Sequence, residues 1–188
     1  MKNTLFIGFF ILNCSLIVNG QNASLITNGA FNGNPAFTAW DIQEVERTTI
    51  SQLQGGNPGG YIWLNHQGGN TDPAVEQEIY GLTIGKQYTI TGDYRAGKDA
   101  ENNCQCMGTQ VLAIDIDGKE IATFPMPEHP SQWVQFTATF TANSTNHRIR
   151  FRAEINGTDG DVALDNISVV PKMADWYQLK KAVDDRGR

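Results

Sequence analysis

The sequence predicts an all-β protein, an antiparallel β-sandwich of the jelly-roll kind. Two observations predict this fold: short segments in which apolar and polar residues alternate, and glycine- and asparagine-rich turns between them. Such alternation is typical of strands with one buried face and one wet face. Before Pro171, no apolar pattern keeps the helical spacing over a dozen residues, and the sequence has no internal repeat. One copy of the domain therefore fills most of the 188-residue chain.

The predicted strands are separated by clear turn signals. GGNPGG (55–60) is a glycine-rich turn, and Asp117-Gly118 is a strong hairpin signal. The most regular alternation is found in WVQFTATFT (133–141) and RIRFRAEI (148–155). The predicted strands are, in order, 61–65, 75–79, 88–91, 111–116, 133–141, 148–155 and 162–170.

The first twenty residues have a different pattern. Residues 1–20 combine Lys2, an apolar run from Leu5 to Val18 and the small residue Gly20, as a secretory signal peptide does. The run is shorter than the about 20 apolar residues that a membrane-spanning helix needs. We therefore expect cleavage near Gly20, a domain over 21–170, and a secreted or periplasmic product without membrane insertion.

The last residues, 171–188 (PKMADWYQLKKAVDDRGR), also break the strand pattern. Trp176, Leu179 and Val183 fall at helical spacing behind Asp175, a residue type that caps helix N-termini well. We expect a short amphipathic helix here, and a linker to a partner or surface is the alternative.

The composition argues against one class of partner. The formal net charge is -6 at pH 7. Nucleic-acid binding requires a basic face that contacts phosphates, so we expect no nucleic-acid partner.

Alternation also sorts the polar residues onto one face of the predicted strands. If these polar sets share one sheet, they form an aromatic platform beside planar charged and amide groups. Such a surface suits sugars, whose C–H faces stack on aromatic rings while their hydroxyls meet carboxylates, amides and guanidinium groups. The alternative is an ordinary solvated sheet face. The candidate residues are Tyr61, Trp63, Asn65, Asp93, Arg95 and Arg150.

Three stretches resemble a known family. They are LITNGAFN (25–32), the segment from Val75 to Tyr88 (VEQEIYGLTIGKQY), and VALDNISV (162–169). In this order they resemble the galactose-binding-like jelly roll, and especially the CenC-type carbohydrate-binding modules. The resemblance covers nearly all of residues 25–170. Its motifs are mostly structural glycines, turns and core positions, so it is specific for the fold and only indicative for the ligand.

The resemblance also implies a structural calcium ion. The family often holds one near the sandwich edge, with ligands from the end of the first motif, from backbone carbonyls around the Gly-Gly segment that corresponds to Gly59-Gly60, and from the aspartate of the last strand. Asp165 matches that aspartate, and Asn32 stands where the family usually has glutamate. Because Asn32 provides a neutral oxygen in place of a carboxylate, a calcium site here would be weakened.

Two cysteines lie close together in GKDAENNCQCMG (97–108), a stretch that resembles a loop of plant cell-wall proteins with galactose-binding-like domains. Cys104 and Cys106 would give a metal two of the four ligands that zinc requires, and the histidines are scattered. In an oxidising compartment we expect a local disulfide, or pairing with a partner chain, and no catalytic role.

These observations favour a secreted, noncatalytic carbohydrate-binding protein that recognises a polysaccharide or glycan. Trp63 is expected to stack on a sugar ring. Trp40 and His66 are candidates for a second, edge-type site, whereas Trp133 is expected to start a buried strand. An arginine stripe in 148–152 would favour an anionic polymer such as a uronate-containing glycan, unless nearby glutamates neutralise it.

Two alternatives remain at this point. The first is an extracellular protein-interaction or wall-structure module. The second is a glycan-active hydrolase, or an accessory domain of one, because such modules often accompany carbohydrate-active enzymes. Glycoside hydrolysis needs two carboxylates about 5–10 Å apart across a cleft, and nothing in the sequence pairs two in this way. The sequence contains no Gly-x-Ser-x-Gly or His-Glu-x-x-His motif, so we expect no catalysis.

Overall fold

The structure is a computed structural model. It describes residues 23–34, 37–43, 48–67, 72–96, 108–127, 131–157 and 159–173. The predicted signal peptide, the Cys104–Cys106 pair and the predicted C-terminal helix lie outside these residues.

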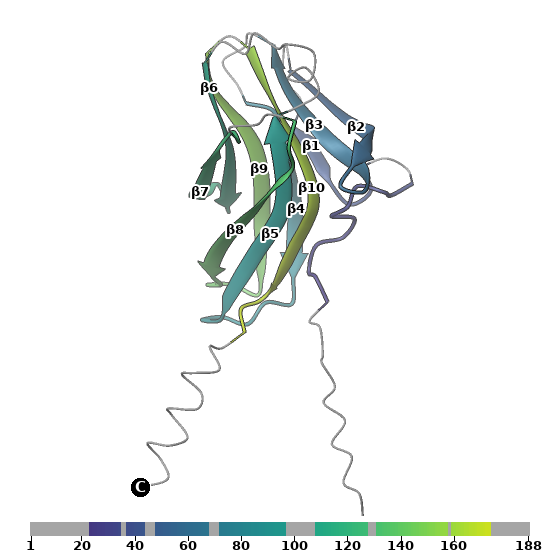
Figure 1. The fold of residues 1–188 in the computed structure, drawn as a ribbon. Coiled ribbons are helices and arrows are strands. Elements are labelled where there is room, and N and C mark those ends of the chain that lie inside the picture. Colours follow the sequence, from purple (N-terminus) through teal and green to yellow (C-terminus); the bar gives the residue numbers. More distant parts are fainter. Residues whose placement is uncertain are drawn as a thin grey trace, which may run out of the picture.

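The described chain forms two antiparallel five-stranded sheets that stack as a sandwich (Figure 1). The sequence prediction of an all-β sandwich is therefore confirmed. Sheet A has the order β1 (Asp41–Gln43), β4 (Ala74–Tyr80), β9 (Asn146–Gly157), β6 (Gly108–Ile116) and β7 (Lys119–Pro125). Sheet B has the order β2 (Thr48–Gly56), β3 (Gly59–Gln67), β10 (Asp159–Pro171), β5 (Gln87–Ala96) and β8 (Val134–Thr141).

Strands β1, β2 and β7 were not predicted. All three lie at sheet edges. β1 has only three residues and β7 lacks a regular apolar alternation, whereas β8, which is also an edge strand, alternates clearly and was predicted. None of the residues of β7 is fully buried.

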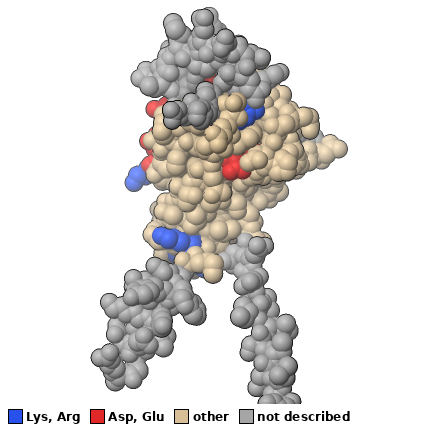
Figure 2. Space-filling model, viewed as in Figure 1, with Lys and Arg blue, Asp and Glu red and all other residues tan. Residues whose placement is uncertain are grey.

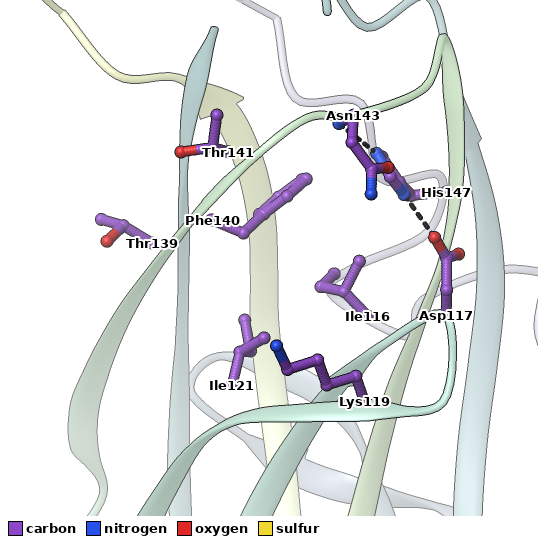
Figure 3. Close-up of a pocket in the computed structure, with 9 residues that line it drawn as sticks. All are labelled: Ile116, Asp117, Lys119, Ile121, Thr139, Phe140, Thr141, Asn143 and His147. Carbon is purple, nitrogen blue, oxygen red and sulfur yellow. Dashed lines mark hydrogen bonds and ion pairs between the residues drawn. The ribbon is translucent and has the colours of Figure 1, made fainter. Parts of the chain in front are cut away.

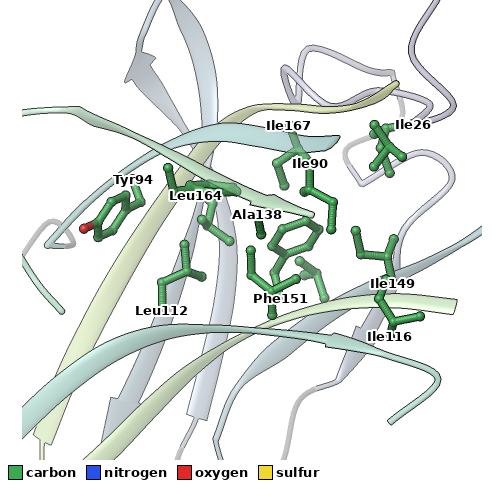
Figure 4. Close-up of a cluster of buried hydrophobic side chains, with 14 of the residues drawn as sticks. Ile26, Ile90, Tyr94, Leu112, Ile116, Ala138, Ile149, Phe151, Leu164 and Ile167 are labelled. Carbon is green, nitrogen blue, oxygen red and sulfur yellow. The ribbon is translucent and has the colours of Figure 1, made fainter. Parts of the chain in front are cut away.

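The core lies between the sheets and follows the predicted alternation (Figure 4). On β8, Phe136, Ala138 and Phe140 are buried while the residues between them are exposed. On β9, Ile149 and Phe151 are fully buried. The side chains between these positions point away from the core, and on sheet B several of them are also buried.

Trp40 belongs to this core and not to an edge-type site. Its side chain is 6% exposed, and its ring lies 5.3 Å from that of Phe31 and 6.0 Å from that of Phe151. Its indole Nε1 donates to the Asn28 carbonyl at 3.1 Å. The prediction that Trp40 contributes to an edge-type site is therefore wrong. For His66, the other predicted member of that site, the structure does not describe the side chain.

The first family-like motif closes one end of the sandwich. The N–H of Ile167 donates to the Gly29 carbonyl at 2.9 Å, and a Cβ on Gly29 would lie 2.0 Å from the Ile167 carbonyl oxygen. Only glycine allows so close an approach of two backbones. Leu25 N–H also donates to Val169 O at 2.8 Å, so the beginning and the end of the described chain lie side by side (Figure 1).

Candidate functional site

The candidate site is the face of sheet B that points away from the core, which we call the outer face of sheet B. Strand register places Trp63 of β3 opposite Ala163 of β10, and Ala163 opposite Arg95 of β5. Trp133 comes directly before β8, whose Val134 pairs with Tyr94. One row across the sheet therefore runs from Trp63 through Ala163 and Arg95 to Trp133.

Arg95 and Trp133 of this row form a compact cluster with Tyr61 of the next row, which we call the Arg95 cluster. The guanidinium carbon of Arg95 lies 5.2 Å from the Tyr61 ring centre and 4.9 Å from the Trp133 ring centre. The two rings meet edge to face at 5.6 Å. Cation–π contacts of this kind hold a guanidinium group in a fixed plane.

Trp63 is anchored at the other end of the row. Its indole Nε1 donates to Asp161 Oδ2 at 2.8 Å, and Asp161 is 1% exposed. The Trp63 side chain is half-buried, so one part of the ring is fixed while another part remains accessible. A ring held in this way loses little freedom when a ligand stacks on it.

A network of carboxylates and amides lies in the next row. Asp93 Oδ2 accepts from Asn166 Nδ2 at 2.9 Å and from Asn57 Nδ2 at 3.2 Å. Asp165 is fully buried and accepts from the N–H groups of Asn57 and Asn166 at 2.5 and 2.7 Å. Burial is the largest influence on the pKa of Asp165, and together with the Asp93 charge it raises that pKa despite these hydrogen bonds.

The structure brings together five of the six predicted binding residues. Tyr61, Trp63, Asn65, Asp93 and Arg95 all lie on the outer face of sheet B. Their exposure differs from the expected open platform, because Tyr61, Asn65 and Arg95 are only 2–3% exposed. Trp63 and Asp93 are half-buried and remain available for contact.

Arg150 does not belong to this face. It lies on β9, which pairs with β4 and β6 in sheet A, so the assumption that all polar sets share one sheet was wrong. The neighbouring arginines are paired with acids. Arg148 Nη1 lies 3.3 Å from Glu76 Oε1, and Arg152 Nη1 lies 2.7 Å from Glu154 Oε2.

The pKa of Arg152 shows how firmly this stripe is paired. Burial lowers that pKa, but hydrogen bonds donated to Asp115 and Glu154 outweigh burial and raise it above its usual value. The stripe therefore offers little free positive charge to an anionic polymer.

The sequence reasoning missed Trp133, Gln135 and Asp161. Trp133 was expected to start a buried strand, but it is half-buried on the outer face of sheet B. The alternation of WVQFTATFT contained the signal, since Val134 and Phe136 point inward and the residues beside them must point outward.

The two side chains predicted to bind calcium both accept hydrogen bonds from the backbone. Asn32 Oδ1 accepts from Gly60 N–H at 2.8 Å, and both oxygens of Asp165 accept backbone N–H groups. The described residues contain no group of three or more His, Cys, Asp or Glu side chains that could hold a metal ion. Calcium takes six to eight oxygen ligands, which can include backbone carbonyl and amide oxygens, so the calcium site stays a prediction.

A separate hollow of about 340 Å³ lies between the edge strands β7 and β8 (Figure 3). His147 and Asp117 lie at one end of it, with Nδ1 of His147 2.6 Å from Asp117 Oδ2. Nε2 of His147 accepts from the N–H groups of Asn143 and Ser144 at 3.3 and 3.4 Å. Since both ring nitrogens are engaged within the protein, His147 acts here as a structural residue.

Comparisons with known proteins show the fold but no family. No protein-family model matches the chain. Halomucin of Haloquadratum walsbyi is 26% identical over 179 residues, a match that covers 81% of this chain. The chain spans 2% of the length of halomucin.

Solved carbohydrate-binding modules share the fold. A CBM4 module is 21% identical with a TM-score of 0.53, and the match covers 78% of this chain and 99% of the module. The CBM22 xylan-binding domain of a Paenibacillus barcinonensis protein is 9% identical with a TM-score of 0.56, covering 82% and 97%. A CBM61 module solved with β-1,4-galactotriose is 11% identical with a TM-score of 0.55, covering 79% and 99%.

The resemblance in fold to carbohydrate-binding modules is therefore confirmed. Two of these relatives bind different sugars according to their descriptions, so the fold alone does not name a ligand. Within the described residues, no helix is both long enough and apolar enough to cross a membrane.

Proposed function

We propose that this protein is an exported, noncatalytic carbohydrate-binding protein that holds a polysaccharide or glycan on the outer face of sheet B. The observation that carries the proposal is the row that ends in Trp63 and the Arg95 cluster. Export is supported by the signal-peptide pattern of residues 1–20. The shared fold of carbohydrate-binding modules supports the class of ligand.

The spacing of the two tryptophans suits a chain of sugars. Three strand spacings separate Trp63 from Trp133, which corresponds to about 14 Å between their backbones. A short oligosaccharide laid across the strands would contact both rings. Asp93 and Gln135 in the next row would then meet its hydroxyl groups.

The charge of this face favours a neutral polymer. Figure 2 shows the molecule in the view of Figure 1. In this view, charged side chains are sparse on the described surface. The arginine stripe lies on sheet A, where Arg148 and Arg152 are paired with acids. A uronate polymer would therefore find little unpaired positive charge.

Affinity electrophoresis of residues 21–188 through gels with xylan, β-glucan, galactan and polygalacturonate tests the proposal. We expect retention by one neutral polymer and a loss of roughly tenfold or more in affinity for Trp63→Ala and for Trp133→Ala. Ile84→Ala is the control, because Ile84 is 64% exposed and lies in the turn before β5.

Retention that survives both tryptophan variants would move the site away from this face. No retention of a folded protein by any polymer would overturn the proposal and favour a protein-binding surface.

A further inference from the structure

A second hollow lies on the opposite side of the sandwich, beside Tyr80 at the end of β4. We call it the Tyr80 pocket; its volume is about 450 Å³. Among the described residues, β1 pairs only with Ala74 to Glu76 of β4. The rest of β4 is flanked by the N-terminal segment, which Gln77 holds by hydrogen bonds to the N–H and carbonyl of Thr27 and to the carbonyl of Ala39. Leu25, Thr27 and Ala39 of that segment line the pocket together with residues of β4.

Tyr80 gives the pocket an aromatic surface. Its side chain is 63% exposed, and Tyr80 is one of the few large hydrophobic residues in the described part of the chain that are exposed. Its neighbour on the same face of β4, Glu78, raises the pKa of Tyr80 chiefly through a hydrogen bond between the two side chains. An exposed aromatic ring is a ready stacking surface for the C–H face of a sugar.

Planar polar groups surround this ring. Glu78 accepts from Asn146 Nδ2 at 2.8 Å, which fixes its carboxylate. Arg148 Nη1 lies 3.3 Å from Glu76 Oε1 and 3.8 Å from Asp41 Oδ2, and the side chain remains 48% exposed. An oriented guanidinium group and oriented carboxylates can share the hydroxyl groups of one ligand.

The charges around the pocket restrict its ligand. Asp41, Glu76 and Glu78 provide three carboxylates against the single guanidinium of Arg148. A carboxylate-bearing ligand would be repelled, whereas a neutral polyol would be accepted. The volume lies within the about 300–1,000 Å³ that small-molecule pockets occupy.

We propose that the Tyr80 pocket is a second saccharide site, which takes a neutral sugar unit through stacking on Tyr80 and hydrogen bonds to Glu78, Asp41 and Arg148. The class of ligand rests on the proposed function, but the site is separate, because it is on sheet A and the first is on sheet B. Two sites on opposite faces allow one molecule to hold two polysaccharide chains. Such bivalent binding raises avidity without any new contact.

Two-dimensional NMR of ¹⁵N-labelled residues 21–188, titrated with xylohexaose, cellohexaose, β-1,4-galactotriose and tri-galacturonate, tests this. With a neutral probe that binds, we expect two groups of shifting amides, one in β3, β5 and β10 and one in β4 and residues 25–41. Tyr80→Ala should remove the second group only, and Trp63→Ala the first only. Tyr80→Phe keeps the ring and is the matched control, which should lose less than threefold in affinity.

The outcomes separate the two proposals. Shifts near β4 that persist in Tyr80→Ala, or none there while sheet B responds, would overturn the Tyr80 pocket and leave the proposed function intact. Shifts confined to β4 and lost in Tyr80→Ala would support the pocket and overturn the site on sheet B. Tight binding of tri-galacturonate at the pocket would contradict the charge argument, and silence with every probe would overturn both sites.

Discussion

His147 joins the β6–β7 turn to the β8–β9 loop at one end of the sandwich, and its removal should destabilise the protein strongly. The side chain is 2% exposed, and its ring lies edge-on to Phe140 at 5.6 Å. Because two backbone N–H groups point at Nε2, that nitrogen is the acceptor and Nδ1 carries the proton that is donated to Asp117. The loop that His147 holds is bonded in turn to the β4–β5 turn, through Gly85 N–H to Ala142 O at 2.7 Å.

The magnitude follows from these contacts. His147→Ala removes three hydrogen bonds, each of which contributes about 1 kcal/mol. The lost ring contact with Phe140 adds about 1 kcal/mol. We therefore expect the free energy of unfolding to fall by about 4 kcal/mol, which corresponds to about 10 °C in melting temperature for a domain of this size.

Urea unfolding followed by tryptophan fluorescence measures this effect. Ser144→Ala is the control, because the Ser144 hydroxyl contacts only Asn146 among the described side chains and its removal should change the unfolding free energy by less than about 0.5 kcal/mol. A loss below about 1 kcal/mol in His147→Ala would refute the view that this histidine ties the loops together.

Three further predictions concern other parts of the fold. Burial raises the pKa of Asp117, but hydrogen bonds from Arg148 N–H and His147 outweigh burial and lower that pKa. The ionised Asp117 therefore stabilises the fold above the usual carboxyl range, and this stabilisation is lost as the pH falls below about 4. Asp117→Asn should flatten that acid limb, which urea midpoints between pH 5 and pH 2 would show; an unchanged limb would contradict this. Since Asp165 accepts backbone N–H groups, adding calcium or EDTA should leave the melting temperature unchanged, and a rise with calcium that Asp165→Ala removes would reveal a metal site. Gly29→Ala places a Cβ against the Ile167 carbonyl, and this overpacking should lower the free energy of unfolding by about 2–3 kcal/mol or more. Gly81→Ala has free space around the new Cβ but a φ of 78°, and should lower it by about 1 kcal/mol. Thermal unfolding measures both effects.

The local structure was predicted well because it depends on local patterns. The alternation in 133–141 and 148–155 correctly assigned which residues point inward, since a strand reverses side with every residue. The same rule placed Trp63, Asp93 and Arg95 on one face.

The pairing of strands could not be read from local patterns, because it is set by contacts between distant segments. β9 is far from β4 in sequence but pairs with it over seven positions, and this pairing moved Arg150 to the other sheet. The predictions for Trp40 and Trp133, which both lie outside the strands, were wrong for a related reason: Trp40 is in the core and Trp133 is on the outer face of sheet B. Trp40 lies in an irregular segment without any period, so nothing in the sequence showed that it enters the core.

The hydrogen bond between Leu25 and Val169 has a consequence for how this domain can be combined with others. A unit whose first and last residues meet can be placed inside a surface loop of a host protein, entering and leaving at one point without opening either sheet. Repeated copies inserted in this way would project sideways from the host chain, with the outer faces of both sheets free. Grafting residues 23–173 into an exposed loop of an unrelated carrier should therefore preserve both folds.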